Sequence, residues 1–257
     1  MDVQLIPLQL VQIDFLGTFK GMKKYLILLV LLVPGSRMSD HKELKINKVK
    51  SIEELSFESI SEVLETSGIE QSIDHINWND YSYAPQVTFK IAHSDEMIYL
   101  KFKVIEEHIV AKRTETNSST HRDSCVEFFI DPDDSGGYYN FEFNCIGTAH
   151  IAYGPNRKNR TFIDKDLIES QLFIASSLGR EPFEEKSGEH QWELVAAIPA
   201  SLFVYHQGLN FDGLNAKANL YKCADDSTKP HYLSWSKVNS ERPDFHRPEY
   251  FGSFHFN

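Results

Sequence analysis

Two neighbouring stretches of the chain alternate aromatic residues with carboxylates and amides. The first, residues 124–131, reads SCVEFFID, and the second, residues 138–146, reads YYNFEFNCI. If the aromatic side chains face a core, the polar side chains share the opposite face of one sheet, namely Glu127, Asn140, Glu142 and Asn144. Such a row can hydrogen-bond sugar hydroxyls, because each hydroxyl needs both a donor and an acceptor. An ordinary solvated sheet face is the competing interpretation of the same pattern.

The loop between these two stretches is acidic and rich in turn-forming residues. Asp131, Asp133 and Asp134 offer the hard oxygen ligands that calcium prefers. The loop lacks the regular spacing of an EF-hand. We therefore expect no required cofactor, and a structural calcium ion at these three aspartates is a candidate.

The surrounding elements are predicted to be strands. Alternation of period two indicates strands over 87–91, 98–104, 124–131, 138–146 and 192–198, and further strands over 216–221, 232–235 and 251–256. Residues 177–188 contain two glycines and a proline and predict a loop. No helix of the length that links parallel strands separates these segments. The fold class is therefore all-β, a two-sheet antiparallel β-sandwich over residues 41–257, with a short helical or irregular N-terminal segment over 51–67.

The first part of the chain carries the layout of an export signal. Met22, Lys23 and Lys24 precede an unbroken apolar run over 25–33, and small residues follow it. This layout predicts a signal peptide over 22–37 and an exported, periplasmic or secreted protein. Residues 1–21 would then be an over-extended, unstructured start. A buried core strand is the alternative interpretation of the apolar run.

The charge balance excludes two classes of partner. The formal net charge is −11, from 37 acidic residues against 26 lysines and arginines, and no long basic run occurs. This argues against nucleic acid, whose phosphates attract basic surfaces. The acidity equally disfavours an anionic membrane surface, and membrane insertion is not expected.

Three cysteines, Cys125, Cys145 and Cys223, are widely spaced and form no CxxC motif. Their odd number and spacing match neither a zinc-site pattern nor a disulfide framework. Buried free thiols are the favoured interpretation. If a bridge forms in an oxidising compartment, Cys125 with Cys145 is the expected pair, because their strands are predicted neighbours.

Taken in order, several short motifs resemble family 9 carbohydrate-binding modules, including a variant branch found in exported bacterial proteins. The similarity extends from about Ile73 to the C-terminus. The motifs are Ile76–Trp78, Met97–Leu100, Asp123–Asp131, Trp192–Leu194, Leu233–Ser236 and Pro248–Gly252. The resemblance implies a non-catalytic β-sandwich that holds sugar units between two aromatic rings, often at the reducing end of a glycan.

The resemblance also implies roles for individual residues. Glu127 takes the position of the family's acidic sugar contact, and Phe245 that of one ring of the aromatic clamp. The other clamp position holds His121 where the family has Trp. Glu142 stands where the family has a basic contact, and Asn144 keeps an amide two residues later. The altered clamp and the reversed charge put reducing-end specificity in question.

Arg247 is a further candidate, because it follows Phe245 in a proline-bounded loop, where functional side chains are commonly displayed. Either its guanidinium donates two hydrogen bonds to adjacent sugar hydroxyls, or it forms a plain salt bridge. A nearby basic loop, with Arg157 and Arg160, either borders the same site or is solvated.

The predicted function is therefore carbohydrate binding, with an oligosaccharide or polysaccharide as ligand and separate glycan-degrading enzymes as candidate partners. Two other hypotheses remain open. One is a b-type haem sandwich for electron transfer, with His93, Met97 and His108 as candidate axial ligands. The other is a protein-interaction scaffold whose sugar site has decayed, which the His121 and Glu142 departures suggest.

Overall fold

The computed structural model describes residues 42–257. The signal peptide expected over 22–37 and the start segment expected over 1–21 lie outside the described residues. Within the described part, no helix is both long enough and apolar enough to cross a membrane.

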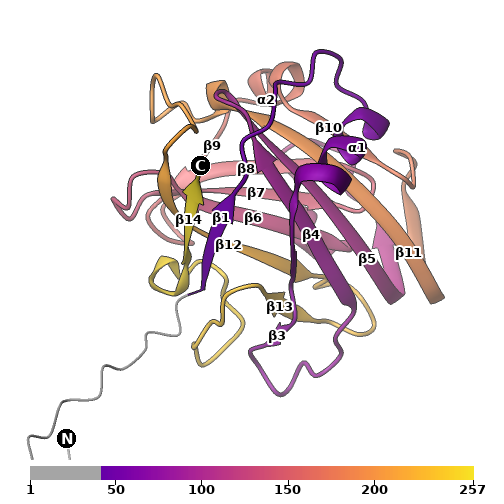
Figure 1. Cartoon of the computed structure of the whole chain (residues 1–257). Coiled ribbons are helices and arrows are strands. Elements are labelled where there is room, and N and C mark those ends of the chain that lie inside the picture. The colour runs from indigo at the N-terminus through magenta and orange to yellow at the C-terminus, as the bar shows by residue number, and fades with distance from the viewer. Residues whose placement is uncertain (1–41) are drawn as a thin grey trace, which may run out of the picture. The chain divides into compact units, whose positions relative to one another are not determined.

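Strands dominate the fold and form two sheets, which confirms the predicted β-sandwich (Figure 1). The nine-stranded sheet has the main order β1 (Glu43–Ile46), β14 (Gly252–Phe256), β12 (Asn215–Cys223), β6 (Cys125–Asp131), β7 (Tyr138–Asn144), β8 (Ala149–Gly154) and β9 (Thr161–Phe162). Two short strands lie off this main path: β13 (Tyr232–Ser234) pairs with β12, and β3 (His75–Ile76) pairs with β13. The five-stranded sheet has the order β10 (Phe173–Ser176), β11 (Phe183–Pro199), β5 (Met97–Ala111), β4 (Gln86–His93) and β2 (Ile69–Ser72). Among these strand pairs only β1 with β14 is parallel.

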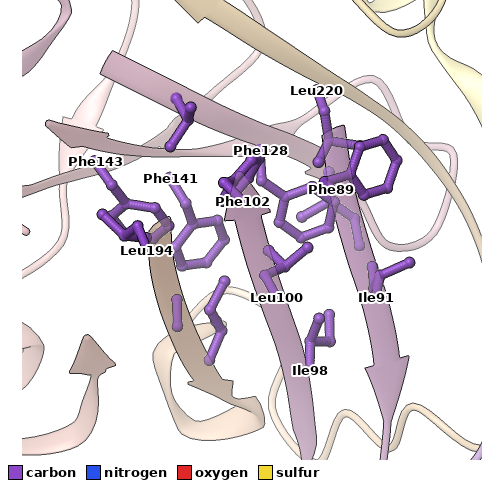
Figure 2. Packing of buried hydrophobic residues seen from close by; sticks show 14 of the residues in the cluster. Phe89, Ile91, Ile98, Leu100, Phe102, Phe128, Phe141, Phe143, Leu194 and Leu220 are labelled. Carbon is purple, nitrogen blue, oxygen red and sulfur yellow. The ribbon is translucent and has the colours of Figure 1, made fainter. Parts of the chain in front are cut away.

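The main core fills the space between the two sheets (Figure 2). Phe128 on β6 lies directly opposite Phe141 on β7, and their stacked ring centroids are 6.2 Å apart. From the other sheet, Phe102 on β5 is paired with Leu194 on β11, and both are fully buried in the same cluster. Burying each such side chain contributes roughly 1.5–3 kcal/mol. The period-two pattern thus assigned the inward face of these strands correctly.

The N-terminal segment contains an ordered helix, α1 (Phe57–Ser67). Ser56 caps it by accepting a hydrogen bond from the main-chain nitrogen of Ser59, and the Ser59 hydroxyl accepts one from the main chain of Ser56. Ile60 and Leu64, one helical turn apart, are both buried. They pack on the outer face of the five-stranded sheet, where α1 lies over β4 and β5 (Figure 1). The alternatives predicted for residues 51–67 were a short helix and an irregular segment, and the helix is confirmed over Phe57–Ser67.

The prediction of a loop over 177–188 is wrong for its last six residues. β11 begins at Phe183 and follows the long strand β5, with register shifts between Phe183 and Lys186 and between Ser187 and His190. Gly188 has a φ of +116°, a conformation that side chains other than glycine rarely adopt. The irregular register breaks the period-two alternation, so this half of the strand carries no strand pattern in its sequence.

The outward face of β6 and β7 is covered, and its interpretation as an ordinary solvated sheet face is wrong. Glu127 is 2% exposed and Glu142 is 4% exposed. The chain that follows β13 packs over this face and completes a second apolar cluster there. The cluster consists of Trp78, Cys125, Phe129, Tyr138, Tyr221, Cys223, Val238, Phe245 and Phe251.

Replacing Phe141 with alanine should lower the free energy of unfolding by about 3–5 kcal/mol, because the buried ring leaves a cavity between the sheets. Urea unfolding followed by circular dichroism measures the change. Phe162→Ala is the control, since that ring is 60% exposed on β9, and it should change stability by less than about 0.5 kcal/mol. Equal losses in the two variants would contradict this packing arrangement.

Candidate functional site

A pocket of about 320 Å³ opens on the covered face of the nine-stranded sheet. Its floor comes from β6, β7 and β12, and its walls come from the loops that follow β8 and β13. The lining residues are His121, Glu127, Glu142, His150, Arg157, Lys158, Arg160, Phe162, Cys223, Asp225, Tyr232, Pro243, Asp244, Phe245 and His246. Four of the six sugar-contact residues expected from the sequence therefore meet in one place: His121, Glu127, Glu142 and Phe245.

Two carboxyl groups form the floor of the pocket. Glu127 on β6 and Glu142 on β7 are directly opposed across the two strands, so their side chains leave the sheet side by side. One Glu142 oxygen accepts a hydrogen bond from the Asn140 side chain at 2.8 Å, and the other accepts one from the Thr120 hydroxyl at 3.4 Å. Glu127 accepts a hydrogen bond from the Cys223 thiol at 3.2 Å.

The surroundings push the pKa values of the two carboxyls in opposite directions. Burial, and then the nearby charge of Glu142, raise the pKa of Glu127 well above its usual range. Burial also acts to raise the pKa of Glu142, but His121 and His150 outweigh it and lower that pKa to about 2. The His121 Nδ1 lies 3.7 Å from Glu142 Oε2, and this pairing raises the pKa of His121. The two carboxyls of the floor therefore lie side by side with pKa values shifted in opposite directions.

One wall of the pocket is cationic and is held in place by Arg160. In the loop between β8 and β9, the Arg160 guanidinium donates to the Asn140 side chain at 2.8 Å and to the carbonyl oxygens of Tyr138 and Gly154 at 2.9 and 3.0 Å. These contacts fix the loop, and Arg157 and Lys158 at its tip line the pocket. Of the two interpretations of this basic loop, bordering the site is the one that the structure supports.

The aromatic residues differ from a simple two-ring clamp. Phe245 is only 8% exposed and stacks on Tyr221, with ring centroids 4.1 Å apart at an interplanar angle of 14°. One face of Phe245 is therefore occupied. The most exposed ring of the pocket is Phe162, which meets His150 edge-on at 5.2 Å.

Phe162 was not predicted from the sequence, because it lies on a two-residue strand that has no alternating pattern. Its only signal is a single aromatic residue directly after a basic loop. Asp225, Tyr232 and Asp244 were likewise missed as pocket residues, since the path of their loops over the sheet leaves no periodic signal.

Asn144 and Arg247 do not line this pocket. Asn144 is fully buried, and its side chain donates to the Arg113 carbonyl at 2.8 Å and to the Asp123 carboxylate at 2.9 Å. It holds the chain around β7 in place and is not free for a ligand. Arg247 donates to the Glu249 carboxylate at 2.7 Å. Of the two roles considered for Arg247, a sugar contact or a plain salt bridge, the structure contains the salt bridge. Arg247 lines a neighbouring groove instead.

The acidic loop after β6 forms a self-contained turn. Asp131 accepts hydrogen bonds from the main-chain nitrogens of Gly136 at 2.7 Å and Ser135 at 3.3 Å. Asp133 accepts one from Ser135 at 3.2 Å, while Asp134 has a φ of 56°. These bonds engage both oxygens of Asp131 and one of Asp133, three of the six carboxylate oxygens that calcium could use. Calcium binding at this loop stays a prediction.

The candidate haem ligands lie elsewhere. His93 is fully buried, with its ring nitrogens 3.1 Å from the carbonyl oxygens of Ser94 and Asn257. His108 contacts Thr228 at 3.0 Å and Glu185 at 3.3 Å. Neither histidine lines the pocket described above, and Met97 borders a different one.

Comparison with known proteins identifies the family and the fold. The family model described as carbohydrate-binding family 9 matches residues 58–256. A solved structure of a candidate carbohydrate-binding protein from Bacteroides uniformis is 39% identical, with a TM-score of 0.81, and the match covers 84% of this chain and 100% of that chain. No curated protein matches this chain.

A family 9 carbohydrate-binding module from Caldicellulosiruptor kristjanssonii is more distant. Its complex with glucose is 13% identical, with a TM-score of 0.51 and coverage of 84% of this chain and 96% of that chain. Its complex with cellotriose is also 13% identical, with a TM-score of 0.50 and coverage of 83% and 93%. At this identity the likeness extends to the fold. The family match over residues 58–256 shows that this chain belongs to carbohydrate-binding family 9.

Proposed function

We propose that the pocket over β6, β7 and β12 binds the terminal one or two units of an oligosaccharide or polysaccharide, without catalysing its cleavage. The observation that carries this proposal is the carboxyl pair Glu127 and Glu142 on the pocket floor. Carboxyl oxygens accept hydrogen bonds from sugar hydroxyls, and a carboxyl that keeps its proton can also donate one. The volume of about 320 Å³ is near the lower end of ligand pockets, which are about 300–1,000 Å³, and suits a small ligand end.

The walls support the same assignment. Phe162 offers an exposed ring against which the apolar face of a sugar can pack. Arg157, Lys158, Asp225 and Asp244 add donors and acceptors to the lining of the pocket. The family 9 module from Caldicellulosiruptor kristjanssonii was solved with glucose and with cellotriose, so β-linked glucose oligomers are the first ligands to test.

The proposed cellular role goes beyond the binding site. We propose that the protein works outside the cytoplasm and holds glycan ends for separate degrading enzymes. This part rests on the family and on the export layout of the sequence. Which glycan end is bound depends on the residues that line the pocket.

Glu142→Gln should weaken cellotriose binding by about tenfold or more, because a hydrogen bond to a charged group contributes roughly 1.5–3 kcal/mol. Isothermal titration calorimetry on the full chain measures the change. Glu62→Gln, on the exposed side of α1, is the matched control and should bind like the unmodified protein. If Glu142→Gln binds cellotriose as tightly as the control variant does, the carboxyl pair does not contact the sugar.

Phe162→Ala should weaken binding roughly tenfold, because stacking of an aromatic ring contributes about 0.5–1.5 kcal/mol beyond the area it buries. Its control is Tyr205→Ala, since Tyr205 is 50% exposed but does not line the pocket. Affinity electrophoresis on a panel of soluble polysaccharides compares the two variants. A loss in the Tyr205 variant alone would place the sugar elsewhere.

Reducing the end of the oligosaccharide to an open-chain alditol should abolish most of its binding, because the proposed ligand of this small pocket is the cyclic terminal unit. Titration of cellotriose and of its reduced form compares the two ligands directly. Equal affinities would mean that the pocket binds internal sugar units or the opposite end of the chain.

A further inference from the structure

Two thiols and a carboxyl converge directly beneath the sugar pocket. Cys125 and Glu127 both point outward from β6, and Cys223 lies directly opposite Cys125 on β12. The two sulfur atoms and a Glu127 oxygen all lie within 4.8 Å of one another. This is the only set of three such ligand atoms within that distance among residues 42–257.

These separations suit a tetrahedral metal site. With zinc–sulfur bonds of about 2.3 Å and zinc–oxygen bonds of about 2.1 Å, tetrahedral ligand atoms lie roughly 3.6–3.8 Å apart. The Cys223 sulfur is 3.2 Å from Glu127 Oε1. Small side-chain rotations would therefore bring the three atoms around one ion without any shift of the strands.

The charges around these groups favour a bound cation. Glu127 and Glu142 are neighbouring buried acids, and burial of a carboxyl is costly unless a partner compensates it. Glu142 has His121 beside it, whereas the hydrogen-bond partner of Glu127 is the Cys223 thiol. Across the described residues, no lysine or arginine forms an ion pair with either glutamate. A cation held by the two sulfurs and Glu127 would supply the missing positive charge.

The pocket gives an ion access to this set. Glu127 and Cys223 both line the pocket, and Cys125 lies fully buried beside them. With three protein ligands, a tetrahedral ion would keep its fourth position for water or for a ligand atom in the pocket. Thiolate sulfurs are soft ligands, so this site should prefer zinc-like cations to calcium or magnesium, which prefer oxygen ligands.

We propose that Cys125, Cys223 and Glu127 form a binding site for a thiophilic divalent cation such as Zn²⁺. The three cysteines are free thiols in the structure. Binding forms two metal–sulfur bonds and one metal–oxygen bond, and the two thiol protons, together with the carboxyl proton where Glu127 is protonated, pass to solvent. The site shares Glu127 and Cys223 with the sugar pocket, but it needs no sugar to form, so it can be tested without any sugar.

The test uses the reduced, metal-free full chain titrated with Co²⁺, whose thiolate complexes absorb by charge transfer in the near ultraviolet. Zn²⁺ then competes for the same site. We expect one Co²⁺ per chain, and displacement of its absorption by Zn²⁺. Cys125→Ser and Cys223→Ser should each weaken Co²⁺ binding by more than about 100-fold, since even residues behind the ligands change affinity about 10–100-fold.

Cys145→Ser is the matched control. Cys145 is equally buried, but it lies in the core between the sheets, where its thiol donates to the Val110 carbonyl at 3.7 Å. A serine hydroxyl can make the same bond, so this variant should bind Co²⁺ as the unmodified protein does. Circular dichroism establishes that each variant is folded.

Three outcomes would overturn the proposal. The first is the absence of charge-transfer absorption in the reduced, unmodified protein. The second is an equal loss of Co²⁺ binding in Cys145→Ser and Cys223→Ser. The third is a Cys125–Cys223 disulfide in the native protein that resists reduction, because it would consume both sulfur ligands.

Discussion

The register between β6 and β7 governs both the core and the pocket. Phe128 opposite Phe141 and Glu127 opposite Glu142 are consequences of one alignment. Because side chains alternate along a strand, a slip of a single residue would move the aromatic rings to the pocket and the carboxyls into the core. The stacked phenylalanines between the sheets therefore also fix where the acids stand. The apolar side of these strands secures the position of the polar side.

Burial of acids on a sheet face works against stability, and the chain tolerates it only because the other face is so extensively packed. The fully buried aromatic rings of β5, β6 and β7 hold the strands in place, while Arg160, Asn140 and His121 arrange the polar groups around the pocket. Natural proteins keep such locally unfavourable groups mainly where a ligand uses them. The same two strands thus carry fully buried core rings on one face and, on the other, two carboxyls whose pKa values are shifted in opposite directions.

Alternation in the sequence was enough to predict the strands that have one apolar face, and hence the sandwich. It could not reveal β9, which has two residues, or the first half of β11, whose register is irregular. In the site, Glu127 and Glu142 follow from period two, and His121 and Phe245 follow from the family resemblance. Phe162 and Asp225 enter the pocket through loop paths that no periodicity encodes. Asn144 shows the limit of the pattern, because it lies on the expected face but is used to anchor a loop.

The position of β1 has a practical consequence for how the protein can be attached to a support. Glu43–Ile46 forms one edge of the nine-stranded sheet, and Phe162 lies on β9 at the opposite edge. The two edges are separated by six strand-to-strand intervals of about 4.8 Å each, roughly 29 Å along the sheet. A linker joined ahead of Lys42 thus leaves from the side away from the exposed ring of the pocket. Coupling through that end to a chip or a bead would leave the β9 edge, with Phe162, away from the point of attachment.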